Sequence, residues 1–268
     1  MTTMEERRQR LYRADAIVLK RRDHGEADRL LTVFSAQHGK LVLLAKGVRK
    51  TRSRKAGHVE LFTYSTILIA KTRTWDLVTQ AETVETYLGL RDDLSRTAQA
   101  YYVAELLDSF TQESDSNPPM FLLLRDTLNR LATVRDESLA IAVRFYELRL
   151  LGLAGYQPEL FRCIECEDEL QPVTNYYSTA GGGVLCPRHG EGQIGAEPLN
   201  LALFKTLRFM QTRDWDTVER LSLSPGLHTE LERLLQATMV YHLERSLRSL
   251  VFIRTLREQM LAHQKPVA

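Results

Sequence analysis

Residues 29–45 read RLLTVFSAQHGKLVLLA, and this stretch decides the fold of the N-terminal part of the chain. Two runs rich in branched and aromatic residues, 29–34 and 40–45, are typical of β-strands. His38 and Gly39 separate the runs, and a glycine supplies the positive φ that a tight turn between antiparallel strands requires. The stretch therefore predicts a β-hairpin.

Three further strand-like runs flank this hairpin, at residues 15–22, 60–71 and 75–80. No long helix-periodic segment occurs between residues 14 and 83. Five antiparallel strands in so short a segment cannot bury both faces of an open sheet, whereas closure into a small barrel also removes the exposed edges. We expect an N-terminal five-stranded OB-fold barrel. An SH3-like barrel has a similar number of strands, and periodicity alone does not distinguish the two.

The segment between the third and fourth predicted strands, residues 46–55, contains six cations and no acid. The six cations are Lys46, Arg49, Lys50, Arg52, Arg54 and Lys55. Their mutual repulsion predicts an extended, mobile loop, and phosphate groups would neutralise it and release counterions. Further cations stand on or beside the predicted strands: Lys20, Arg21, Arg22, Arg29 and Lys40. We predict that all of these residues contact nucleic acid; the alternative is a solvated loop that only keeps the protein soluble.

Three aromatic residues of the same segment, Phe62, Tyr64 and Trp75, occur at strand spacing and could stack on unpaired bases. Each of them, taken singly, is more often a core residue. No motif of the kind that reads base edges in a duplex groove is found in the sequence. The pattern predicts binding that does not depend on sequence.

Charge is distributed unevenly along the chain, although the formal net charge is only +2. Through residue 90 there are 17 Lys and Arg against 10 Asp and Glu, and the remainder has 19 against 24. A basic first part suits a polyanion, whereas an acidic remainder suits protein contacts or solubility.

After Leu90 the hydrophobic period changes from two residues to about 3.6, which predicts helices. The predicted helices cover residues 93–110, a segment from Asn117-Pro118 onward, 136–152 with Asp136 as its cap, 199–210, and 227–260 as one long helix or a kinked pair. The last segment carries two pairs of arginines spaced by three: Arg245, Arg248, Arg254 and Arg257. On a helix each pair lies on one face, which predicts a solvated surface; the alternative is a secondary contact with DNA or a partner protein. We expect an α+β, multi-domain protein with an OB-fold domain over residues 1–88 and a helical domain over residues 89–268.

All three cysteines of the chain fall in one short segment together with a histidine. Cys163 and Cys166 have two residues between them, and Cys186 and His189 have the same spacing. Two such knuckles, joined by a glycine-rich predicted hairpin, let four donors converge tetrahedrally, as zinc prefers, and leave no position for a reactive water. We predict one structural zinc ion per chain, in a module inserted at residues 157–196. The alternatives are three reduced cysteines beside an unrelated histidine, or a shell that another ligand completes.

The sequence lacks the phosphate-binding loop, the dinucleotide motif, the zinc-protease motif and the serine-hydrolase motif. We therefore predict that the protein is not an enzyme. The first residues are charged and lack the apolar centre of a signal peptide, and no apolar run reaches membrane-spanning length. We expect a cytoplasmic protein that does not contact membranes.

Several stretches together carry a family resemblance. They are residues 16–19 (AIVL), 25–30 (GEADRL), 39–41 (GKL), 45–50 (AKGVRK), 53–54 (SR), 145–151 (FYELRLL) and 155–158 (GYQP), with the two knuckles. In this order and spacing they resemble the bacterial RecO family of recombination mediators over nearly the whole chain. One departure is His189, which stands where many members of the family have a fourth cysteine, and some members have lost the site.

The resemblance implies an OB-fold, a helical C-terminal domain with an inserted zinc module, and a cytoplasmic, nucleoid-associated role in repair by homologous recombination. It also implies binding of single- and double-stranded DNA, annealing of complementary strands, and cooperation with RecR in loading RecA onto DNA covered by single-stranded DNA-binding protein. Two other functions fit the residues alone. They are an RNA-binding OB-fold protein and a scaffold whose basic loop recruits acidic protein tails.

Overall fold

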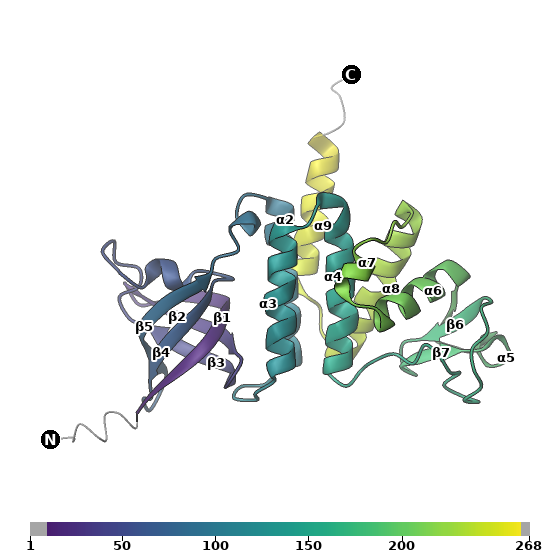
Figure 1. The fold of residues 1–268 in the computed structure, drawn as a ribbon, viewed down its shortest axis with the longest axis horizontal. Helices are drawn as coiled ribbons and strands as arrows, with labels where there is room; N and C mark the ends of the chain where they lie inside the picture. Colours follow the sequence, from purple (N-terminus) through teal and green to yellow (C-terminus); the bar gives the residue numbers. More distant parts are fainter. Residues whose placement is uncertain (1–9, 264–268) are drawn as a thin grey trace. The chain divides into compact units, whose positions relative to one another are not determined.

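The computed structural model describes residues 10–263, which form two compact units. One unit contains residues 10–133 and 249–263, and the other spans Val134–Arg248. Figure 1 shows the elements that make up each unit. The barrel and the helices that directly follow it in sequence belong to the same compact unit. Compact units are not the same as domains, and the division into domains at residues 1–88 and 89–268 stays a prediction.

Between residues 11 and 85, five strands form a closed barrel in the order β1-β2-β3-β5-β4. The strands are β1 (Leu11–His24), β2 (Asp28–Ser35), β3 (Gly39–Ala45), β4 (Tyr64–Ala70) and β5 (Asp76–Glu85). β1 pairs with both β2 and β4, which closes the barrel. This arrangement confirms the predicted five-stranded, OB-fold-like barrel. One detail of the prediction was wrong, because β3 and β5 pair in parallel and not antiparallel.

The core of the barrel follows the two-residue period of its strands. The inward-facing residues are Ala14, Ala16, Val18, Leu31, Val33, Leu43, Ala45, Ile67, Ile69 and Val78. Val48, just after β3, and Val59, in the short 3-10 helix η1 (Ala56–Val59), complete this core from outside the strands. Burying one such branched side chain stabilises the fold by about 1.5–3 kcal/mol, so closure of the barrel is driven by these residues.

The turn between β2 and β3 requires a glycine at position 39. Gly39 has a φ of 64° and pairs with Ser35 across the hairpin. A Cβ atom at this position would also overlap the backbone carbonyl oxygen of Asp115. The residue is therefore fixed by its conformation and by the close approach of another backbone segment, and the predicted role of Gly39 in the turn is confirmed.

The bounds of three strands, β1, β4 and β5, differ from the prediction by more than one residue. β4 begins at Tyr64 and not at residue 60, because η1 precedes it and Phe62 has a positive φ of 62°. β1 and β5 are longer than predicted at their ends, where their side chains are mostly exposed. Polar, exposed strand ends do not show the hydrophobic alternation on which the prediction depended.

The helices of the first unit are the 3-10 helix η2 (Leu88–Leu90), α2 (Leu94–Phe110), α3 (Pro118–Thr133) and α9 (Arg248–His263). The carboxylate of Asp93 accepts a hydrogen bond from the backbone amide of Arg96 at 2.9 Å, and the side-chain oxygen of Asn117 accepts one from Met120 at 3.1 Å. These contacts satisfy amides that the first helical turn leaves without partners, and they confirm the predicted starts of both helices.

The second unit combines a small sheet with helices. Its sheet has the order β7-β6-β8. The elements are α4 (Asp136–Leu153), β6 (Asn175–Ser178), β7 (Gly183–Leu185), α5 (Pro187–Gly190), β8 (Ala196–Leu199), α6 (Leu201–Thr212), α7 (Trp215–Val218) and α8 (Pro225–Leu243). Among the helices that the structure describes, none is long and apolar enough to cross a bilayer.

The structure corrects one predicted helix cap and decides between the two alternatives for the last helical segment. Arg135 is the N-cap of α4, without a side-chain hydrogen bond, and Asp136 lies in the first turn, where its charge favours the helix dipole. For residues 227–260 the sequence left open one long helix or a kinked pair, and the structure shows two helices, α8 and α9, separated where Glu244 adopts a left-handed conformation with a φ of 51°. Arg245 lies between the two helices, so it does not share a helical face with Arg248.

Candidate nucleic-acid interface and metal centre

The basic loop, residues 46–55, is folded into successive turns and is not extended as predicted. The backbone amide of Gly47 donates to Asp28 Oδ1 at 2.7 Å, and the amide of Arg49 donates to the carbonyl of Ala27 at 2.9 Å. Within the loop, the amide of Lys50 donates to the carbonyl of Gly47 at 3.2 Å. Together with the burial of Val48, these bonds outweigh the repulsion between the cations.

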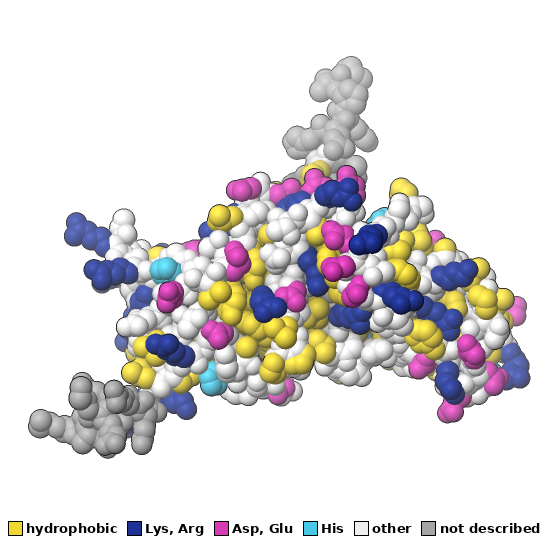
Figure 2. Space-filling model, in the orientation of Figure 1, with side chains coloured by type: hydrophobic (Ala, Val, Ile, Leu, Met, Phe, Trp, Pro, Cys, Tyr) yellow, Lys and Arg dark blue, Asp and Glu magenta, His cyan; other side chains and the backbone are white. Residues whose placement is uncertain are grey.

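The folded loop presents much of its charge to solvent. Lys46, Lys50, Arg52 and Arg54 are exposed, and none of them makes an ion pair with another residue between 10 and 263. Arg22, on β1, is exposed in the same way. Figure 2 shows Lys and Arg side chains that project from the barrel, at the left of the view. Unpaired, exposed cations of this kind are available to phosphate groups.

Other predicted cations take part in a chain of ion pairs on the barrel surface. Arg49 Nη2 lies 3.4 Å from Asp23 Oδ2, and Arg29 bridges Asp23 Oδ1 at 3.2 Å and Glu60 Oε1 at 3.1 Å. Arg21 forms an ion pair with the other oxygen of Glu60. We call these five residues the arginine–carboxylate chain. It holds three guanidinium groups with only two carboxylates, so it keeps a positive excess.

Lys40 and Lys55 make contacts inside the protein. The ammonium group of Lys40 donates to the carbonyl of Thr111 at 2.6 Å and to that of Asp108 at 2.7 Å, and it lies 3.3 Å from Asp108 Oδ1. Because an ammonium group has three donors, Lys40 has none to spare for a phosphate group. Lys55 donates to the carbonyl of Val78 at 2.8 Å, and burial lowers its pKa.

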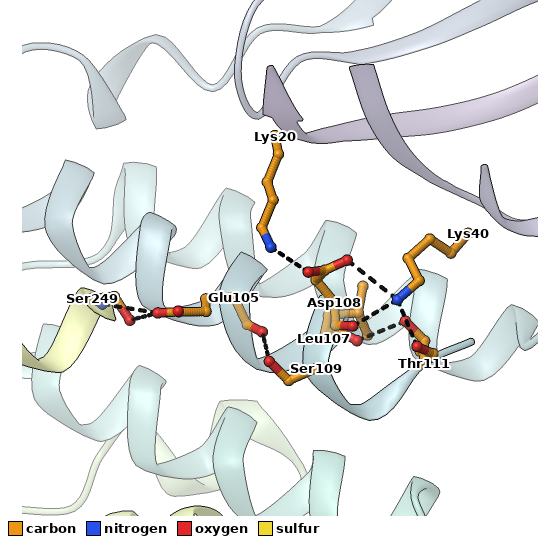
Figure 3. A network of polar contacts seen from close by, with 8 residues as sticks. All are labelled: Lys20, Lys40, Glu105, Leu107, Asp108, Ser109, Thr111 and Ser249. Carbon is orange, nitrogen blue, oxygen red and sulfur yellow. Dashed lines mark hydrogen bonds and ion pairs between the residues drawn. The ribbon is translucent and has the colours of Figure 1, made fainter. Parts of the chain in front are cut away.

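Asp108, on α2, binds two lysines of the barrel (Figure 3). Its carboxylate pairs with the ammonium groups of Lys20 and Lys40. Burial raises the pKa of Asp108, but these two cations outweigh burial and hold the pKa below its ordinary value of 3.8. Figure 3 also shows Glu105 of α2 bonded to Ser249 of α9, whose backbone amide donates at 2.8 Å. Polar contacts from α2 therefore reach both the barrel and α9.

Replacing Asp108 by Asn is expected to lower the free energy of unfolding at pH 7 by about 2 kcal/mol, the range for hydrogen bonds to charged groups. The pKa of Asp108 is lower in the folded protein than the ordinary value of 3.8. The stability that its carboxylate contributes is therefore complete above pH 3.8 and is lost as the pH falls through the pKa of the folded state. Urea unfolding of wild type and variant at neutral and strongly acidic pH measures this difference. Asp126→Asn is the control, since its ion pair with Arg125 is exposed and should contribute little. Equal losses at both pH values for Asp108→Asn would contradict the prediction.

The aromatic residues proposed as stacking groups have different surroundings. Phe62 is buried against Tyr101, with ring centroids 5.1 Å apart, and Tyr64 packs against Phe121 at 5.5 Å. Trp75 is half-buried in the turn between β4 and β5, where its ring meets that of His24 at 5.1 Å. The rings therefore lie in three separate contacts and do not form one platform.

Two cations that the sequence reasoning missed, Lys71 and Arg73, are exposed in the turn between β4 and β5. OB-folds bind oligonucleotides on the face of strands 2 and 3 and through the loops β1–β2 and β4–β5. The sequence feature that could have indicated these contacts is the run KTRTW, residues 71–75, which has two cations and a tryptophan close together. The candidate interface therefore includes this turn as well as the basic loop.

The two knuckles of the second unit converge as predicted. One ligand atom from each of Cys163, Cys166, Cys186 and His189 can be chosen so that all lie within 4.8 Å of one another. His189 Nδ1 lies 3.4 Å from Cys186 Sγ and 3.7 Å from Cys163 Sγ. A tetrahedral zinc site with ordinary bond lengths places sulfur and nitrogen about 3.6 Å apart. These residues therefore fit a metal ion, and the alternative of an unrelated histidine is not supported.

The small sheet positions these ligands. β6 and β7 form the predicted hairpin, with Tyr177 opposite Val184, and return the second knuckle to the first (Figure 1). The amide of Ile164 donates to the carbonyl of Val184 at 3.0 Å, which ties the first knuckle to β7. The strand β8, which pairs with β6, was not predicted.

The surroundings of Cys163 favour its thiolate. Burial raises the pKa of this thiol, but backbone hydrogen bonds from Cys166, Cys186 and Glu165 and a contact with His189 outweigh burial and lower the pKa to about 6. The thiolate is the form that binds metal ions. Four protein donors would complete a tetrahedral shell without an open position, as in structural sites.

Two family models match the chain. The model described as "Recombination protein O N terminal" matches residues 9–87, and "Recombination protein O C terminal" matches residues 91–250. Several curated proteins named DNA repair protein RecO are similar over most of their length. That of Roseiflexus sp. (strain RS-1) is 40% identical over 97% of this chain and 91% of its own length. That of Dehalococcoides mccartyi (strain CBDB1) is 35% identical over 92% and 96%, and that of Pelotomaculum thermopropionicum is 38% identical over 91% and 94%.

Proposed function

This chain belongs to the recombination protein O family, with a role in DNA repair and recombination, and from that premise we propose that it is a mediator that binds single- and double-stranded DNA and anneals complementary strands. The observation that carries the proposal is the set of exposed, unpaired cations on the basic loop: Lys46, Lys50, Arg52 and Arg54. An OB-fold-like barrel that presents such a loop suits a sugar-phosphate backbone. No catalytic step is assigned to the protein.

Annealing follows from charge neutralisation. Two complementary strands repel each other through their phosphates, and a cationic surface that holds both backbones lowers this repulsion. The loop cations carry no base-reading geometry, so each strand is held irrespective of its sequence and its base edges stay free to pair. The turn with Lys71, Arg73 and Trp75 extends the same surface and adds an aromatic ring.

We further propose that the protein works with RecR to load RecA onto DNA covered by single-stranded DNA-binding protein, at the nucleoid in the cytoplasm. Membership of the family supports this proposal. A reconstituted reaction tests it: RecA filaments should form quickly on covered DNA when both this protein and RecR are present. Filament formation at the same rate without this protein would contradict it.

A salt series tests DNA binding directly. Affinity for single-stranded DNA, duplex DNA and RNA of equal length should be measured by fluorescence anisotropy from low to moderate salt. For DNA, the logarithm of the binding constant should fall linearly with the logarithm of the salt concentration. A strong preference for RNA would favour an RNA-binding protein instead. Negligible DNA affinity at low salt, with tight binding of an acidic peptide, would favour a protein scaffold.

For the knuckles we propose one structural zinc ion per chain, held by Cys163, Cys166, Cys186 and His189. The convergence of the ligand atoms and the lowered pKa of Cys163 support this assignment. Zinc would supply folding free energy by joining the two knuckles, and no reaction chemistry.

A further inference from the structure

A cavity of about 330 Å³ opens in the first unit beside β1 and α2. Its lining includes the aromatic residues Phe62 and Tyr101, the apolar Leu90, and the guanidinium groups of Arg21 and Arg91. Small-molecule sites span roughly 300–1,000 Å³, so this cavity has room for one base and its sugar but not for a duplex.

The aromatic wall of the cavity is fixed by an unusual backbone. Phe62 has a φ of 62°, a conformation that bulky residues rarely adopt. Two backbone hydrogen bonds to Val18 of β1 hold Phe62 in this conformation. The amide of Phe62 donates to the carbonyl of Val18 at 2.9 Å, and the amide of Val18 donates to the carbonyl of Thr63 at 3.2 Å. The strained conformation presents the ring of Phe62 edge-on to Tyr101, with an interplanar angle of 80°. Strain of this kind is concentrated at functional sites.

Tyr101 is the accessible member of this pair. It is 41% exposed, whereas Phe62 is 6% exposed. A ring that is buried on one side and open on the other can stack on an incoming base. Stacking of this kind is tolerant of sequence, since every base has an aromatic face.

The cavity also carries positive charge that continues from the basic loop. Arg21 is the last member of the arginine–carboxylate chain, which begins at Arg49 in the loop. The side chain of Arg91 makes a long contact, from its Nη2 to Thr63 Oγ1 at 3.4 Å. The arginine–carboxylate chain thus links the basic loop to the cavity, with three guanidinium groups against two carboxylates.

We propose that this cavity receives one unpaired base of single-stranded DNA, with Tyr101 stacked on the base and Arg91 paired with the adjacent phosphate. The inference deepens the proposed function and rests on it. An acidic peptide is the competing occupant. The nucleotide is favoured because the arginine–carboxylate chain leads from the basic loop to the cavity and because Tyr101 offers a ring on which a base, but not a carboxylate, can stack.

Photocrosslinking tests the assignment with the full-length protein. An oligothymidine with a single 5-iodouracil, moved along the strand, should cross-link to Tyr101 or Phe62 at one position, as mapped by mass spectrometry. Tyr101→Ala should weaken binding of the unmodified strand about fivefold or more, the loss of one stacked base. Tyr101→Phe, which keeps the ring, should bind like wild type. Tyr241→Ala, at a tyrosine of similar exposure (50%) in the other unit, should also bind like wild type.

A strand with one abasic site completes the test. In wild type, an abasic site at the cross-linking position should cost as much affinity as Tyr101→Ala, and in Tyr101→Ala it should cost nothing more. If wild type binds DNA but Tyr101→Ala binds equally well, the cavity proposal is wrong and the proposed function stands. If Tyr101→Ala loses affinity for an acidic peptide but not for DNA, the cavity proposal is also wrong. If wild type does not bind DNA at low salt, the proposed function itself fails.

Discussion

Replacing Lys46, Lys50, Arg52 and Arg54 together by alanine is expected to weaken binding of single-stranded DNA by roughly 100- to 1,000-fold at 0.1 M salt. These four side chains are exposed and have no ion-pair partner among residues 10–263, so DNA is free to engage all of them. Each phosphate contact to a single strand contributes about 0.7 to the salt slope, so the slope should fall by roughly 3. Affinity measured over a range of salt concentrations checks both values.

Folding should change little, because the loop is held by backbone bonds and by the buried side chain of Val48, which the variant keeps. The matched control removes the same charge from exposed positions of the second unit: Arg162, Lys205, Arg213 and Arg220, each to alanine. This control should retain nearly all of the affinity. Equal losses in both variants would show that total charge, and not the basic loop, determines binding.

Cys163→Ser is expected to reduce the metal content from about one zinc per chain to nearly none and to lower the melting temperature by roughly 10 °C or more. Structural zinc contributes several kcal/mol of folding free energy, and for a protein of this size each kcal/mol corresponds to roughly 2–4 °C. Metal content by mass spectrometry and thermal unfolding measure the two effects. Amide hydrogen exchange should show that residues 157–196 lose protection first.

Two variants separate the ligand role of His189 from a general packing role. His189→Cys should keep the metal, since thiolate is an equally good zinc ligand, whereas His189→Ala should lose most of it. Both variants should bind DNA within about twofold of wild type, because the proposed DNA contacts lie in the first unit. Wild-type protein that contains no metal after purification in zinc, and is equally stable in a chelator, would refute the assignment.

Local sequence patterns predicted the barrel and the knuckles. The strands of the barrel are visible as β-rich runs because the side-chain period of a strand is a property of neighbouring residues, and Gly39 marks the hairpin by its own conformation. The four proposed ligands are visible because both knuckles have a fixed short spacing. Boundaries were less visible where a local feature had no hydrophobic signal, as at Phe62 and Glu244, whose positive φ angles belong to residues that rarely adopt them.

The sequence by itself determined that the N-terminal part is basic, forms a five-stranded barrel and lies in one chain with a regularly spaced set of four residues that could hold a metal ion. Only the tertiary structure decided which cations are available. Lys40 is bonded to residues 68 and 71 positions away, Lys55 to one 23 positions away, and Arg21 to one 39 positions away. Charge is a property of a residue, but its availability depends on which partners the fold brings within reach, and periodicity carries no information about such distant pairs.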